Sequence, residues 1–113
     1  MAAYEIPNMR FSAEAGATVA RRRFVKINAY EQGVQAGAGE AVVGASMVDA
    51  AKGEVLEIAN GIVMVEAAAA IVAGSEVQSD ANGKAKTKDT GVAAGVAMTN
   101  ASGEGALVSI LIR

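Results

Sequence analysis

Side chains suited to acid–base or nucleophilic chemistry are scarce in this chain of 113 residues. It contains no cysteine and no histidine. That composition excludes disulfides, thiolate chemistry, imidazole general-base catalysis and most zinc sites. Among the acidic residues, Glu40, Glu54, Glu57 and Glu66 are scattered along the chain, without the two-acid arrangement that glycoside hydrolysis requires. We therefore predict that the protein is not an enzyme.

Two short segments could hold a charged ligand. Residues 79–83 (Ser-Asp-Ala-Asn-Gly) resemble the start of a calcium-binding loop, but they lack the third oxygen ligand and the distal bidentate glutamate. Residues 37–39 (Gly-Ala-Gly) lack the following Gly-Lys-Ser/Thr sequence of a phosphate-binding loop. We interpret both segments as turns or loops, and we predict neither a metal nor a cofactor.

Lys52 is the candidate for covalent carrier chemistry. It lies in residues 49–53, which could form the tip of a hairpin like the one that carries the modified lysine in biotinyl and lipoyl domains. Neither Met47 nor Met98 adjoins a lysine, so the Met-Lys-Met signature of biotinyl domains is absent. A carrier module therefore stays an alternative.

A run of three arginines, Arg21, Arg22 and Arg23, is the sharpest charged feature. In a strand Arg22 would point away from the side of its two neighbours. The run could form a charged, solvated edge strand, or it could anchor the protein on an acidic protein surface. Aromatic residues make up only 4% of the chain and the net charge is −2, so we predict no nucleic-acid partner.

Charge is segregated along the chain. Residues 1–26 carry a net charge of +3, residues 27–83 a net charge of −7, and residues 84–113 a net charge of +2. Such asymmetry bears on association rather than on fold. The uncharged stretch from Ala67 up to Glu76 is far shorter than the roughly 20 residues that cross a bilayer. We expect no membrane contact and no secretory signal.

Residues 1–15 form a candidate extended arm, followed by a domain over residues 16–113. Pro7 fixes its own backbone and favours an extended conformation at Ile6. Apolar side chains gather in this short segment at Tyr4, Ile6, Met9 and Phe11. A terminal arm with this much apolar surface usually docks on something. The alternative is that it forms an edge strand of the protein's own sheet.

From residue 17 onward the pattern is that of β structure. Segments 23–27, 54–58, 61–65 and 106–112 are short and rich in β-branched residues, and several alternate apolar with polar positions. Turn signals separate them, including Asn-Gly at 60–61 and at 82–83. Turns spaced about 8–12 residues apart predict a small barrel or sandwich. The alanine-rich residues 66–71 are too few for a stable helix and are interpreted as a corner.

The two halves of the chain resemble each other at an offset of about 51 residues, with two shifts of one residue. The first matching set is Val19, Val25, Asn28, Ala29 and Gly33 with Ile71, Val77, Asp80, Ala81 and Gly83. The second is Gly44, Met47, Asp49, Ala50, Gly53 and Glu54 with Gly95, Met98, Asn100, Ala101, Gly103 and Glu104. This duplication predicts a barrel of two related halves.

A strand-and-turn pattern of Gly, Ala and Val recurs in residues 23–26, 37–45, 52–62, 73–85, 91–97 and 107–113. This pattern resembles that of small tailed-phage capsid cement or head decoration proteins. Together these segments cover roughly residues 17–113 and leave the arm outside.

The resemblance implies an all-β fold, a small β-barrel or β-tulip-like domain. It implies attachment to the outer face of the capsid at capsomer junctions, after the shell expands, by a protein made in the cytoplasm of a bacterial host. The major capsid protein would be the partner, and the protein would form a homo-oligomer, a trimer first and a dimer as the alternative. A stand-alone binding or carrier module and a phage tail or fibre subunit remain the competing functions.

We assign docking on the shell or on a neighbouring subunit to residues of the arm and of the arginine run. An arm that crosses a subunit boundary supplies apolar and aromatic anchors, and the arginines add charge pairing. The predicted docking residues are Tyr4, Ile6, Pro7, Met9, Arg10, Phe11, Arg21, Arg22 and Arg23.

Overall fold

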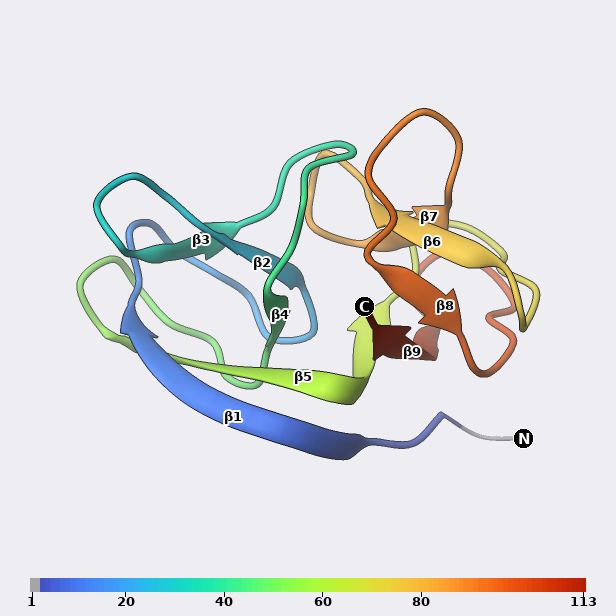
Figure 1. Cartoon of the computed structure of the whole chain (residues 1–113), viewed down its shortest axis with the longest axis horizontal. Helices are drawn as coiled ribbons and strands as arrows, with labels where there is room; N and C mark the ends of the chain where they lie inside the picture. Colours follow the sequence, from blue (N-terminus) through green and yellow to red (C-terminus); the bar gives the residue numbers. More distant parts are fainter. Residues whose placement is uncertain (1–2) are drawn as a thin grey trace.

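The computed structural model describes residues 3–113, and within them the secondary structure is entirely β (Figure 1). Nine strands join in one sheet through antiparallel pairing. The strands are β1 (Ile6–Glu14), β2 (Phe24–Ile27), β3 (Gly33–Gln35), β4 (Gly44–Ser46), β5 (Val55–Glu66), β6 (Glu76–Ser79), β7 (Ala85–Thr87), β8 (Gly95–Ala97) and β9 (Leu107–Ile112). The prediction of an all-β domain is confirmed. Among residues 3–113 there is no helix of the length and hydrophobicity needed to cross a bilayer.

The same strand pattern occurs twice, which confirms the two quasi-repeated halves. In the first half β2 pairs with β3 and β4, and β4 pairs with β5. In the second half β6 pairs with β7 and β8, and β8 pairs with β9. The halves are joined where β5 pairs with β9. Figure 1 shows the first half on the left and the second on the right, with the long strand β5 running between them.

Backbone hydrogen bonds define which residues are equivalent, and they correct three pairs predicted from the sequence. The Ala15 N–H donates to the Glu54 carbonyl and the Ala67 N–H to the Ala106 carbonyl, so Glu54 corresponds to Ala106 rather than to Glu104. Gly53 donates its N–H to the carbonyl of Ala15, and Gly105 donates to the carbonyl of Ala67, so Gly53 corresponds to Gly105 rather than to Gly103. In the same way the bonds from Glu31 to Asn28 and from Gly83 to Asp80 make Glu31, rather than Gly33, the counterpart of Gly83.

β5 is one strand of twelve residues, whereas the sequence predicted two strands separated by a turn at residues 59–61. Before this point Leu56 and Ile58 are buried, and after it Val63 and Val65 are buried. The buried face thus changes from even-numbered to odd-numbered residues. Gly61 has a φ of 95°, a left-handed conformation that glycine adopts without strain. The Asn-Gly pair therefore bends a continuous strand instead of closing a hairpin.

The core of the described residues is built largely from small side chains in two clusters. One cluster belongs to the first half and contains Leu56 and Ile58, whereas the larger one spans β5, β8 and β9 and reaches Phe24. Ten of the twenty-one buried apolar residues among residues 3–113 are alanines. Each buries little apolar area, so contacts beyond the single chain would add useful stability.

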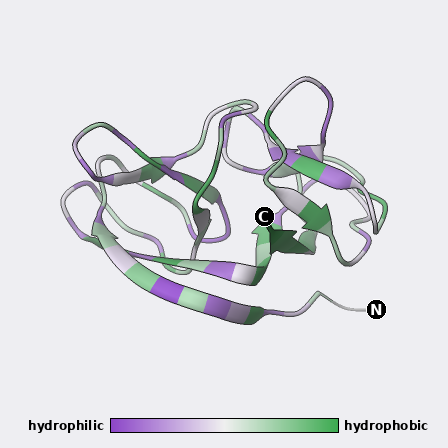
Figure 2. Ribbon diagram, in the orientation of Figure 1, coloured by the Kyte–Doolittle hydropathy of each residue, from purple (hydrophilic) through white to green (hydrophobic). Residues whose placement is uncertain are grey.

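The extended N-terminal segment is an integral strand of the first half. β1 pairs with β5 from Ile6 opposite Ile62 to Glu14 opposite Val55. Its pair Arg10–Ala59 is equivalent, at an offset of 52, to the pair Ile62–Leu111 of β5 with β9. Figure 2 shows hydrophobic and hydrophilic residues mixed along β1. The first five residues of β1 are exposed, and only Phe11 and Ala13 are partly covered. Residues 6–14 thus form the edge strand of the second sequence alternative, and docking by their exposed side chains stays a prediction.

Candidate docking surface

The predicted docking residues of β1 divide into an exposed group and a half-buried one. Ile6 and Met9 are 61% and 54% exposed, and Pro7 and Arg10 are exposed beside them. Phe11 is half-buried and packs against the core cluster of the first half. The exposed group, Ile6, Pro7, Met9 and Arg10, is called the β1 strip below. The strip contains the exposed residues among those predicted to dock, and Asn8, Ser12 and Glu14 of β1 are exposed beside them.

A β-bulge shapes the β1 strip. Pro7 pairs with Gly61 and Met9 pairs with Asn60, so Asn8 is left over between them. A Cβ atom on Gly61 would lie 2.4 Å from the backbone nitrogen of Asn8. The bulge therefore requires the glycine, and it bends β1 where its apolar side chains emerge.

An open cleft of about 470 Å³ adjoins the strip where the two halves meet. Its walls come from the start of β1, the bend of β5, the segment before β4 and the end of β9. Ile6, Val43 and Leu111 are exposed apolar residues on its rim. The sequence analysis missed Val43 and Leu111. Leu111 occupies an outward position in an alternating strand, but nothing in the sequence shows that the bend of β5 brings Val43 beside it.

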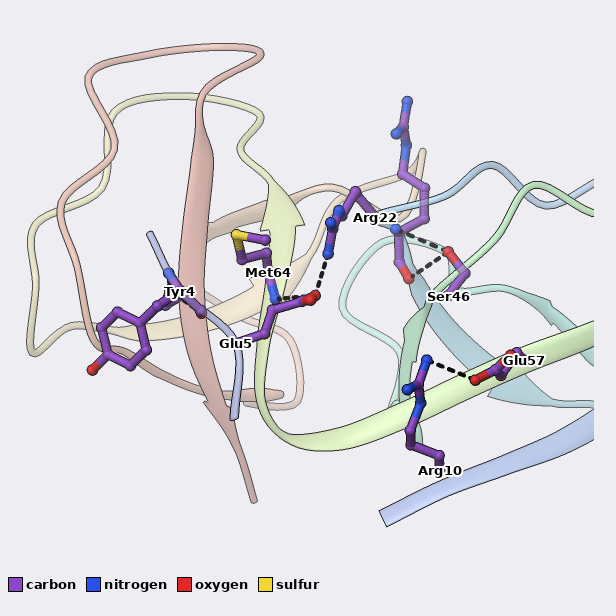
Figure 3. Close-up of polar contacts among 9 residues, drawn as sticks. Tyr4, Glu5, Arg10, Arg22, Ser46, Glu57 and Met64 are labelled. Carbon is purple, nitrogen blue, oxygen red and sulfur yellow. Dashed lines mark hydrogen bonds and ion pairs between the residues drawn. The ribbon is translucent and has the colours of Figure 1, made fainter. Parts of the chain in front are cut away.

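Polar contacts fasten Tyr4 and Glu5, which precede β1, to the body of the protein (Figure 3). The Ser109 hydroxyl accepts a hydrogen bond from the Tyr4 N–H and donates one to the Tyr4 carbonyl, both at 2.6 Å. The Glu5 carboxylate forms an ion pair with Arg22 and accepts a hydrogen bond from the Met64 N–H at 3.4 Å. Figure 3 shows the Tyr4 ring pointing away from the Glu5–Arg22 pair. These contacts attach the segment before β1 to β9, to β5 and to Arg22.

The three arginines do not form a common cationic patch. Arg22 pairs with Glu5, and Arg23 pairs with Glu66 at 2.7 Å. Arg21 is exposed, and its guanidinium forms no ion pair within residues 3–113. Arg21 is therefore the member of the run that is free for an outside partner, whereas the other two hold the fold together.

Arg10 also has an internal partner. Its guanidinium lies 2.7 Å from the Glu57 carboxylate, and both side chains are largely exposed. An exposed pair of this kind contributes at most about 1 kcal/mol. Arg10 can therefore exchange Glu57 for a partner's carboxylate at little cost.

The segments considered for ligands have structural roles. The Asp80 carboxylate accepts hydrogen bonds from the Asn82 and Lys84 N–H groups, both at 2.8 Å, which makes residues 79–83 a closed turn. No cluster of three or more acidic, histidine or cysteine side chains that could hold a metal occurs among residues 3–113. Lys52 is exposed in a turn, and the structure offers no test of its modification.

Two carboxyl groups are held ionised by hydrogen bonds. The pKa of Glu40 is lowered because its carboxylate accepts hydrogen bonds from the Lys26 ammonium and from the Gly37 N–H. The pKa of Asp89 is lowered to about 2, first by the hydrogen bond from Lys86 and then by that from the Thr90 N–H. Both groups brace surface loops and do not form an acid–base pair.

Comparisons with known proteins point to one family. A family described as phage cement protein matches residues 5–113. Among solved structures, the head fiber gp8.5 N base of bacteriophage phi29 is similar, with a TM-score of 0.75, 22% sequence identity and 93% of each chain covered. At that identity the likeness shows a shared fold. No curated protein matches the sequence.

Proposed function

This chain belongs to the phage cement protein family, and from that premise we propose that it binds the outer surface of the capsid at capsomer junctions and stabilises the expanded head. The major capsid protein is the partner in this proposal. The protein acts by contact alone, without catalysis, cofactor or metal. It forms a homo-oligomer on the shell, with a trimer as the first expectation and a dimer as the second.

The observation that carries the proposal is the β1 strip beside the apolar rim of the cleft. Ile6 and Met9 project from a strand that pairs along its length with β5. A rigid strand loses little conformational freedom when its side chains are buried against a partner. Arg21 is exposed and Arg10 can exchange its Glu57 partner, so both arginines are available to pair with acidic groups of the shell protein. Repetition of such contacts over a shell gives avidity even where each contact is weak.

A fibre-base function is the second candidate. The similar solved structure is the base of a head fiber, and its fold is shared over nearly the whole chain. As a fibre base, the domain would still attach to the head, and the rest of the fibre would be built on it.

Co-sedimentation with purified expanded heads tests the proposal. The variants Ile6→Ser and Met9→Ser reduce the apolar area of the β1 strip, and Val72→Ser is the matched control because Val72 is an exposed apolar residue outside the strip. We expect the wild-type protein and the control to bind at a fixed stoichiometry, and each strip variant to bind roughly tenfold more weakly.

Two outcomes would contradict the proposal. A wild-type protein that never sediments with the heads would exclude a cement function, and intact-mass analysis of Lys52 would then test the carrier alternative. Equal binding by the strip variants and the control would move the docking surface away from β1. Light scattering of the bound and free protein separates the trimer from the dimer.

A further inference from the structure

The hairpin that connects β2 and β3 presents an aromatic side chain on a rigid tip. Tyr30 is 83% exposed, more than any other large apolar or aromatic residue among residues 3–113. Asn28 closes the turn, because its side-chain oxygen accepts hydrogen bonds from the Tyr30 N–H at 2.9 Å and from the Gln32 N–H at 3.0 Å. The Glu31 N–H donates to the Asn28 carbonyl at 3.1 Å. The tyrosine is therefore held outward by an ordered backbone.

Glu31 occupies a backbone conformation that favours glycine. Its φ is 64°, and its counterpart in the second half is Gly83, with a φ of 74°. The two turns share their bonding, since Asp80 accepts from the N–H groups of Asn82 and Lys84 as Asn28 does in the first half. The second half thus has Asn-Gly at its tip, the composition that suits such a turn, whereas the first half has Tyr-Glu.

The polar ends of the Tyr30 and Glu31 side chains make no contact in the described part of the chain that offsets this strain. Neither the Tyr30 hydroxyl nor the Glu31 carboxylate forms a hydrogen bond or an ion pair with residues 3–113. Arg22, the other residue with a left-handed backbone that is not glycine, does gain an ion pair with Glu5. Strained residues persist where the surroundings or a function compensate for the cost. At Glu31 the hydrogen bonds of the Asn28 turn hold the backbone in place, and the exposed side chains of Tyr30 and Glu31 remain available to a partner.

We propose that Tyr30 and Glu31 form an aromatic–carboxylate tip that inserts into a recess of the capsid shell protein lined by apolar and arginine or lysine side chains. This inference rests on the proposed function and adds a second contact to the β1 strip. A guanidinium or ammonium group can stack on the tyrosine ring and pair with the neighbouring carboxylate. A preorganised turn loses little conformational entropy on binding.

The charge around the tip favours a cationic recess. Gln32, within the same turn, donates a hydrogen bond from Nε2 to the exposed carboxylate of Glu14 at 2.8 Å. The tip thus carries Glu31 with Glu14 nearby. The closest basic residue of the hairpin, Lys26, is already bound to both carboxylate oxygens of Glu40. A partner surface of opposite charge fits this arrangement.

Titration of four variants against purified expanded heads, with melting temperatures measured in parallel, tests the inference. Tyr30→Ala removes the ring, Glu31→Gln removes the charge but keeps the strain, and Glu31→Gly removes both. Asn82→Ala is the matched control at the equivalent tip of the second half. We expect roughly tenfold weaker binding for Tyr30→Ala. Glu31→Gln should bind more weakly and with a smaller dependence on salt.

Glu31→Gly provides the sharpest readout, because stability and binding should move in opposite directions. Relief of the left-handed strain should raise the melting temperature by roughly 3 °C. Loss of the carboxylate should weaken binding to the heads as Glu31→Gln does. A residue with only a structural role would not couple higher stability to weaker binding.

The outcomes separate this inference from the proposed function. If the wild-type protein binds heads and all four variants bind equally well, the tip is not a contact and the inference fails alone. If the wild-type protein does not bind heads, the proposed function and the inference both fail. If Tyr30→Ala changes the size of the free protein by light scattering but not its binding to heads, the partner is a second copy of the chain and the shell assignment is wrong.

Discussion

Arg22 and Gly74 occupy equivalent positions in the two halves and share a left-handed backbone, with φ values of 66° and 90°. The Arg22 N–H donates to the Ser46 carbonyl at 3.1 Å, and the Gly74 N–H donates to the Ala97 carbonyl at 2.8 Å. The first half therefore accepts backbone strain at a position where the second half has glycine. What it gains is the ion pair that fixes Glu5 and, through it, the start of β1.

This relationship predicts an unusual order of stability for variants of Arg22. Arg22→Ala loses the ion pair and keeps the strain, so we expect the free energy of unfolding to fall by about 1–2 kcal/mol. Arg22→Gly also loses the pair but relieves the strain, so it should be about 1 kcal/mol more stable than the alanine variant. Urea denaturation measures both values. A glycine variant no more stable than the alanine variant would contradict the assignment of strain to this residue.

The position of β1 predicts that deletion of residues 2–11 disrupts the first half as well as any docking contact. The deletion removes the β1 partners of Ile58, Ala59 and Ile62 in β5, and it leaves only Ser12–Glu14 to pair with the start of β5. We expect loss of hydrogen-exchange protection in residues 55–62, while β8 and β9 keep theirs.

The control for this deletion is the pair of single variants Ile6→Ser and Met9→Ser, which should retain full protection in β5. Protection of residues 55–62 at the wild-type level after the deletion would show that β1 is dispensable for the fold. In that case the deletion itself would become a clean test of docking.

The strand pattern and the duplication could be predicted because both depend on local features, namely period-two alternation and turn residues. The exact equivalences could not. Gly33 was matched with Gly83 because both are glycines, but the true counterpart of Gly83 is Glu31. The shared property is a positive φ, which the sequence reveals only where a glycine provides it.

Part of the candidate docking surface could also be predicted from local features of the sequence. Apolar residues beside Pro7 marked the β1 strip, and the structure places Ile6 and Met9 on the surface. The separation of the three arginines depends on Glu5 and Glu66, which lie 17 and 43 residues away from their partners in the chain. Pairings this distant follow from the fold and leave no spacing pattern in the sequence.

The lowered pKa of Asp89 predicts how its contribution to stability depends on pH. Because the folded-state pKa, about 2, lies below the ordinary value of 3.8, the contribution is fully present above the ordinary value and is lost as pH falls toward 2. Glu40 shifts in the same direction and adds to the trend. We expect Asp89→Asn to melt below the wild-type protein near neutral pH, and the two proteins to converge near pH 2.

Thermal melts of the two proteins across this pH range provide the measurement, and titration of the Asp89 carboxyl followed by NMR confirms the group responsible. A difference between the proteins that grows as pH falls would have the wrong sign. It would show that Asp89 is not stabilised in its ionised form by Lys86 and Thr90.

The close approach of paired strands at Gly44 and Gly95 gives the most severe prediction. These two residues are equivalent, and each lies in a short buried strand, β4 or β8. A Cβ atom on Gly44 would lie 2.4 Å from the Ala59 carbonyl oxygen, and one on Gly95 would lie 2.0 Å from the Leu111 carbonyl oxygen. An added methyl group must therefore push β4 away from β5, or β8 away from β9, and break backbone hydrogen bonds. We expect each glycine-to-alanine change to lower the free energy of unfolding by roughly 3 kcal/mol or more.

Gly103→Ala is the control, because a Cβ atom there meets nothing within 4 Å. Its φ is not in the left-handed region, so alanine should be neutral or stabilise by less than about 1 kcal/mol. Urea unfolding compares the three variants. If Gly95→Ala is too unstable to purify, Gly44→Ala, with the slightly longer contact, supplies the graded value. If both strand variants and Gly103→Ala keep wild-type stability, the register of β4 on β5 and of β8 on β9 is wrong. The equivalence of the two halves would then be wrong as well.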